Sequence, residues 1–212
     1  MKTKILNSLS LYATLLVIYR IYYTNSLFYS FMLWNLFMAF LPFLISEIIP
    51  LCSKKLLWFF FPLWLLFLPN APYLLTDIFH LQKGELMPMW YDLLMLLTFS
   101  ITGMFLYFLS LLKMYVLISK IHSVSTANII LYGSIFLSSF GIYLGRYLRW
   151  NSWEILQNPT ALFQDVFNRI IHPENHLKTW GITIGYSILF VILFWFVKNI
   201  KINFTFAENN TK

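Results

Sequence analysis

Two acidic residues and a histidine lie where they could transfer protons. Asp77 and His80 are three residues apart, so on a helix they share one face, and a carboxylate beside an imidazole can serve as general base and acid. Asp92 follows Trp90 and Tyr91 at the start of another apolar run, where a helix dipole favours a carboxylate. We predict Asp77, His80 and Asp92 as candidate catalytic residues.

A second group of residues is suited to binding an anion. Arg146 and Arg149 share a helix face, and two guanidinium groups together can hold a phosphate through paired hydrogen bonds. Trp153 and Glu154 follow on the same segment, and Asn70 places an amide between two prolines. We predict these five residues as ligand-binding, with an anionic lipid or a lipid-linked envelope intermediate as the ligand.

Other interpretations of the same residues stay open. Asp77 and Asp92 could pair with Arg146 and Arg149 and serve only as a clamp between helices, because charges near a membrane are costly unless paired. The charged group could also process a lipid-linked substrate, gate a transport path, or dock a partner protein. Whether the protein is an enzyme is left undecided.

Membrane helices must position these residues. Charged residues make up 11% of the chain, against about 25% in soluble domains, and hydrophobic residues make up 59%. A helix needs about 20 apolar residues to cross a bilayer. Uncharged runs of about this length predict membrane helices at residues 5–23, 27–49, 56–80, 91–112, 124–148 and 179–198. We therefore predict an all-α, polytopic membrane helix bundle that forms a single domain over residues 1–212.

The distribution of lysine and arginine predicts the orientation. With six crossings and a cytoplasmic N-terminus, more of these cations fall on the cytoplasmic side, as the positive-inside rule requires. Both termini are then cytoplasmic, and the candidate site residues lie at the outer face. Basic cytoplasmic loops facing anionic lipid also account for the net charge of +7, so no nucleic-acid partner is expected.

Prolines interrupt the third predicted helix. Pro69 and Pro72 each lack the N–H that a continuous helix needs, and residues 56–68 alone are too short to cross. Asn70 between them could cap a new helix that starts at Ala71. We predict a proline-broken helix with its break at residues 69–72. Such a break either lines a transport path or only shapes helix packing.

Residues 159–171 predict an amphipathic helix in the outer interface. Asn158 and Pro159 are a typical helix start, and His172-Pro173 a typical end. One stripe of this segment is apolar and the opposite stripe is polar, as in helices that lie on a membrane. The apolar stripe consists of Leu162, Phe163, Val166, Phe167, Ile170 and Ile171.

Small residues predict where two helices pack closely. Gly141 and Gly145 on the fifth predicted helix, and Gly181 and Gly185 on the sixth, each have the spacing of a close-approach face. We predict that these two helices pack together. The same glycines could instead mediate formation of an oligomer.

Metal and cofactor chemistry are not indicated. His172 and His176 have the spacing of helical metal ligands, but Pro173 lies between them and disfavours a regular helix there. Cys52 is the single cysteine, which excludes an internal disulfide and a cysteine cluster. We expect neither a metal nor a cofactor.

Three motifs together resemble one family of bacterial membrane proteins, the domain of unknown function 1361. They are FLPNAPYLLTDIFHL at residues 67–81, WYDLL at residues 90–94 and GRYLRWNSWE at residues 145–154. The resemblance covers nearly the whole chain. It implies a multi-pass protein of a bacterial plasma membrane, and it implies no activity.

Overall fold

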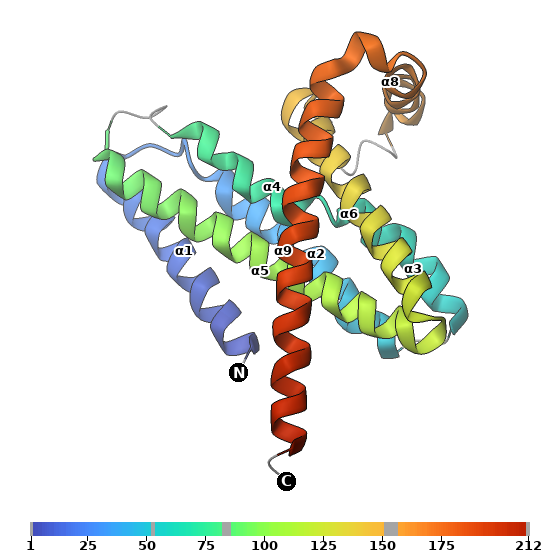
Figure 1. The fold of residues 1–212 in the computed structure, drawn as a ribbon. Helices are drawn as coiled ribbons and strands as arrows, with labels where there is room; N and C mark the ends of the chain where they lie inside the picture. The colour runs from blue at the N-terminus through green and yellow to red at the C-terminus, as the bar shows by residue number, and fades with distance from the viewer. Residues whose placement is uncertain (1, 52–53, 82–85, 151–156, 211–212) are drawn as a thin grey trace. The chain divides into compact units, whose positions relative to one another are not determined.

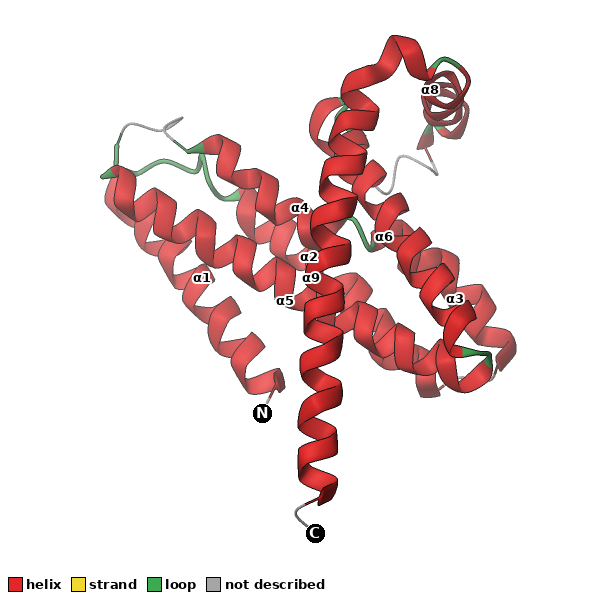
Figure 2. Cartoon of the chain, viewed as in Figure 1, coloured by secondary structure: helices red, strands yellow, loops and turns green. Residues whose placement is uncertain are grey.

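The computed structural model describes residues 2–51, 54–81, 86–150 and 157–210, and all of the regular elements in these residues are helices (Figures 1 and 2). Six helical segments are long and apolar enough to cross a membrane. The predicted all-α, multi-pass fold is therefore confirmed. The chain divides into two compact units, residues 1–110 and 111–212.

Unit 1 contains α1 (Lys2–Thr24), α2 (Phe31–Ile48), η1 (Ile49–Leu51), α3 (Lys54–Phe67), α4 (Asn70–Thr76), η2 (Asp77–His80) and the first part of α5 (Met89–Ile121). Helix α2 packs against α1, α3 and α4. Figure 1 shows α1 alongside the first part of α5, and the Tyr91 hydroxyl on α5 donates to the Leu16 carbonyl on α1 at 2.8 Å.

Unit 2 contains the rest of α5, then α6 (Val124–Tyr147), α8 (Pro159–Ile171), η3 (Pro173–His176) and α9 (Leu177–Asn210). Helices α6 and α9 pack against each other, as the sequence predicted. Trp180 of α9 stacks on Phe136 and Phe140 of α6, with ring centroids 6.4 and 5.9 Å apart.

The prediction that Gly181 and Gly185 form the face of α9 that packs on α6 is wrong, whereas their role in an oligomer stays a prediction. Gly181 and Gly185 are exposed, and a Cβ atom added to either would meet nothing within 4 Å. The face of α9 that is buried carries Thr179, Thr183 and Ser187 instead. Both sets repeat every four residues, so spacing alone does not distinguish the packed face from its neighbour. Small hydroxyl residues on a buried helix face allow close approach of a neighbouring helix.

The proline break is present but short. Helix α3 ends at Phe67 and α4 begins at Asn70, so two residues separate the helices, and Pro72 lies within the first turn of α4. A helix tolerates proline there because its first N–H groups have no intrahelical acceptor. The position of the prolines thus predicted the break, although it spans fewer residues than expected.

Gly103 of α5 is the residue that lets α5 approach this break. A Cβ atom at position 103 would collide with the Ala71 carbonyl oxygen and lie 2.9 Å from Cδ1 of Leu74. The Ser100 hydroxyl, one turn earlier, donates to the Leu74 carbonyl at 3.0 Å. The segment after the break is therefore packed directly against α5.

A buried hydrogen-bonded chain joins three helices of unit 1. The Trp64 indole N–H on α3 donates to the Ser110 hydroxyl on α5 at 2.8 Å, and this hydroxyl donates to the Pro42 carbonyl on α2 at 3.0 Å. Both Trp64 and Ser110 are fully buried. Ser110 thus satisfies a polar group on each of two neighbouring helices.

Replacing Ser110 with Ala should lower the free energy of unfolding by about 1–2 kcal/mol, because the buried Trp64 N–H loses its acceptor. Unfolding by titration with denaturing detergent measures this loss. Ser119→Ala is the matched control, because the Ser119 hydroxyl donates to the Val116 carbonyl of its own helix in a solvent-exposed hydrogen bond of 3.1 Å. Equal stability of the two variants would contradict the prediction.

Candidate functional site

The Asp92 carboxylate forms a buried ion pair with Arg20. The guanidinium Nε and Nη2 donate to the two carboxylate oxygens at 2.6 and 3.0 Å. The side chains are only 1% and 3% exposed. Sequence analysis suggested Arg146 or Arg149 as the partner of Asp92, whereas the structure joins it to Arg20, 72 residues away.

Tyr29 covers this ion pair. Its ring lies 4.2 Å from the Arg20 guanidinium carbon, and its hydroxyl donates to the His80 carbonyl at 2.7 Å. Burial raises the pKa of the Tyr29 hydroxyl, the Asp92 carboxylate adds to the rise, and Arg20 opposes it. The hydroxyl therefore stays protonated at neutral pH and acts as a donor that ties the loop between α1 and α2 to η2.

Asp77 and His80 lie together on η2, as their spacing predicted. Asp77 is fully buried and accepts a hydrogen bond from the Asn35 amide of α2 at 3.0 Å. The His80 ring is half-buried, with the Phe31 and Phe28 rings at 5.1 and 6.4 Å. A 3₁₀ helix eclipses residues three apart, so both side chains start from one side of η2. Their acid and base roles stay a prediction.

Asn70 does not cap α4 as predicted. Its amide donates to the Phe67 carbonyl at 2.9 Å, whereas α4 begins at Asn70 itself and its N-cap position is Pro69. An N-cap side chain would have to accept a hydrogen bond from the first turn. The amide instead donates to a carbonyl at the end of α3, so this contact links the two helices across the break.

Arg146 and Arg149 lie at the end of α6. Arg146 is half-buried in the last turn, and Arg149 is exposed in a left-handed backbone conformation with φ of 63°. The backbone N–H of Trp150, the next residue, donates to the Leu144 carbonyl at 3.1 Å. This hydrogen bond turns the chain back at the end of α6. The other two predicted ligand-binding residues, Trp153 and Glu154, lie outside the described residues.

Two further cations reach this end of unit 2. Lys178 Nζ lies 4.3 Å from the centre of the Tyr147 ring, and the Arg169 guanidinium lies 5.9 Å from that of Tyr143. The two tyrosine rings stack at 5.3 Å. Arg146 and Tyr147 both lie close enough to Tyr186 of α9 to interact with its hydroxyl. We call these four residues the α6-end cations: Arg146, Arg149, Arg169 and Lys178.

Arg169 is the most buried of the α6-end cations. It is 8% exposed, and its Nη1 donates to the Asp165 carbonyl at 2.6 Å and lies 3.4 Å from the Asp165 carboxylate. Its Nε atom is buried and has no hydrogen-bond partner among the residues that the structure describes. A buried charged donor without an acceptor is costly, so this Nε requires a partner such as a water molecule or an anion.

The sequence did not single out Arg169, because it lies on the polar stripe of residues 159–171, opposite the apolar stripe. The helix itself, α8, has the predicted bounds, Pro159–Ile171. However, the inward side of α8 carries Asp165 and Arg169 together with Leu162 and Val166. Periodicity defines the sides of a helix, but it does not decide which side meets the protein.

Comparison with known families gives one match. The sequence model of a family described as a protein of unknown function, DUF1361, matches residues 34–194, most of the chain. The chain belongs to the DUF1361 family. The resemblance of the three motifs is thereby confirmed. In this DUF1361 protein the matched segment contains Asp77, Asp92 and the α6-end cations, whereas Arg20 precedes it. No curated protein and no solved structure matches the chain.

Proposed function

We propose that this DUF1361 protein binds the anionic headgroup of a membrane lipid or lipid-linked intermediate at the α6-end cations. The observation that carries the proposal is the buried Arg169 Nε, which has no acceptor in the described part of the chain. A phosphate oxygen would supply that acceptor, because guanidinium groups match phosphate geometry.

The charge balance at this end of unit 2 supports an anionic ligand. Four cations meet here: Arg146 in the last turn of α6, Arg149 just beyond that helix, Arg169 on α8 and Lys178 at the start of α9. Among the described residues at this end, Asp165 contacts Arg169, and Glu174 lies 3.4 Å from His172. Lys178 and Arg149 are exposed, so a ligand from outside the protein can reach them.

Binding is better supported than processing. A catalytic carboxylate must reach the substrate, but the Asp92 carboxylate is buried and both of its oxygens accept hydrogen bonds from Arg20. The Asp77 carboxylate is fully buried and bonded to Asn35. We therefore assign Asp92 a structural role and the α6-end cations a binding role.

Binding of a fluorescent phosphatidylglycerol to the purified protein in detergent tests the proposal. Lys178→Gln should weaken binding about tenfold, because a hydrogen bond to a charged group contributes about 1.5–3 kcal/mol. Arg169→Gln should weaken it at least as much. Lys178 is exposed, so the first variant should fold normally.

Lys198→Gln is the matched control on α9. Its ammonium group bonds to Asn128 at 2.9 Å and lies over the Tyr115 ring at 4.1 Å, contacts that involve none of the α6-end cations. This variant should bind as the original protein does. Equal affinity of all variants, or equal preference for phosphatidylcholine, would refute the proposal. Competition by inorganic phosphate would identify the headgroup phosphate alone as the ligand.

A further inference from the structure

Helix α8 has its charged side chains, Asp165 and Arg169, on the side that meets the protein. The Trp150 indole donates to the Asp165 carboxylate at 2.8 Å, and the Trp180 indole donates to the Arg169 carbonyl at 3.1 Å. In a helix on the surface of a soluble protein the charged residues face outward. The contacts of Asp165 and Arg169 thus leave a different set of residues on the outside of α8.

The outward side of α8 is largely apolar. Phe163, Phe167 and Ile170 are 68%, 50% and 57% exposed, and the two phenylalanine rings stack at 5.8 Å. Gln164 and Asn168 are also exposed, beside this strip. The outward side therefore combines an apolar strip with an uncharged polar strip. Such a surface suits the boundary between the acyl chains and the aqueous phase.

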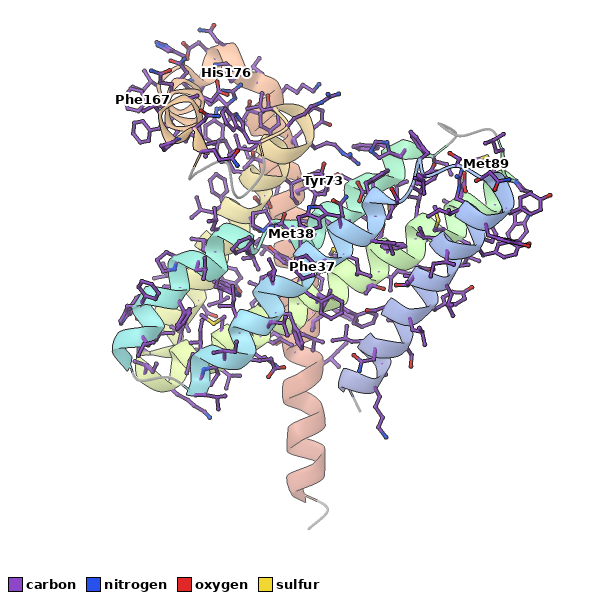
Figure 3. The ribbon with its side chains drawn as sticks, turned by 180° about the vertical axis from the view of Figure 1, so that it is seen from behind. Phe37, Met38, Tyr73, Met89, Phe167 and His176 are labelled. Atoms are coloured by element: carbon purple, nitrogen blue, oxygen red, sulfur yellow. The ribbon has the colours of Figure 1, made fainter. Side chains whose placement is uncertain are left out.

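Chain connectivity places α8 at the membrane surface. The membrane-spanning segment of α6 ends at Tyr147, and the next spanning segment, Pro173–Ile200, starts two residues after α8 ends at Ile171. In Figure 1, α8 is seen almost end-on, whereas α9 is seen along its length. Figure 3 shows the same arrangement from behind, with Phe167 on α8 labelled. Helix α8 thus lies across α9 at the end of its span.

We infer that α8 lies in the bilayer interface with Phe163, Phe167 and Ile170 inserted among the acyl chains. The bilayer is the occupant because α8 joins directly to a spanning helix whose exposed side chains, such as Ile184 and Ile188, already require lipid. Interfacial helices bury their apolar side about 5–10 Å into the boundary between headgroups and acyl chains. The depth of α8 in the membrane does not depend on whether the α6-end cations bind a headgroup.

Fluorescence quenching of single labelled cysteines tests the inference. The starting protein carries Cys52→Ser, and Phe167→Cys or Ile170→Cys receives an environment-sensitive label before reconstitution into phosphatidylcholine vesicles. Lipids with a nitroxide near the headgroup end of the acyl chain should quench both labels about threefold more than aqueous iodide does, as expected for an interfacial depth.

Two reference positions calibrate the result. Gln164→Cys on the polar strip should be quenched mainly by iodide, and Ile188→Cys on α9 mainly by lipids with a nitroxide near the bilayer centre. Iodide quenching of the Phe167 and Ile170 labels without lipid quenching would overturn the inference and indicate a water-facing helix. Protection from both quenchers would also overturn it, because another protein surface would then cover α8.

Discussion

Replacing Asp92 with Asn should lower the free energy of unfolding by about 3–5 kcal/mol, the cost of leaving a buried charge without its partner. Arg20 remains in place and is 1% exposed, so its guanidinium has no access to bulk water. Arg20→Gln should have a similar effect, because it leaves the Asp92 carboxylate uncompensated. Detergent-titrated unfolding of the purified protein measures both losses.

The double variant Arg20→Met, Asp92→Leu separates charge from packing. It removes both charges together, and a buried ion pair replaced by apolar residues of similar volume is often no less stable. We therefore expect it to be more stable than either single variant. Glu174→Gln is the control, because the Glu174–His172 pair is exposed and should contribute at most about 1 kcal/mol. Single variants as stable as the original protein would show that Arg20–Asp92 is not a clamp.

Gly103→Ala should destabilise the protein by about 1–3 kcal/mol, the usual cost of overpacking a closely packed core. The added Cβ atom would meet the Ala71 carbonyl oxygen, which belongs to the backbone and cannot rotate away. This is opposite to the effect of helix propensity, which favours alanine over glycine by about 1 kcal/mol. The sign of the change therefore tests the close approach of α5 to α4.

Gly133→Ala is the matched control for this prediction. Gly133 lies within α6 and is exposed, and a Cβ atom added there would enter open space. Helix propensity alone then applies, so the variant should be as stable as the original protein or slightly more so. Thermal unfolding in one detergent compares the two substitutions, and a loss of stability in both or in neither would contradict the packing argument.

Local signals in the sequence predicted the elements well. Pro159 at a helix start and Pro173 beyond a helix end gave α8 its bounds, and Pro69 with Pro72 located the break before α4. Each of these residues acts through its own backbone, by a fixed φ and a missing N–H. Such effects extend over a few residues only, so the sequence shows them directly.

The partners of charged side chains could not be predicted in the same way. Asp92 has four arginines as conceivable partners, Arg20, Arg146, Arg149 and Arg169, and distance along the chain does not rank them. One signal did favour Arg20: it is an isolated charge between two apolar runs, and such a charge requires a buried partner. The choice of Thr179, Thr183 and Ser187 over the glycines for packing likewise depends on tertiary structure.

The separation of Arg20 from Asp92 has a consequence for biosynthesis. A ribosome that adds about 5–20 residues per second reaches Asp92 several seconds after Arg20, because 72 residues separate them. During that delay the first helix enters the membrane with its arginine uncompensated and must hold that charge near the headgroups. We therefore expect the first helix to reach its final position in the bilayer only after Asp92 has been synthesised and can pair with Arg20.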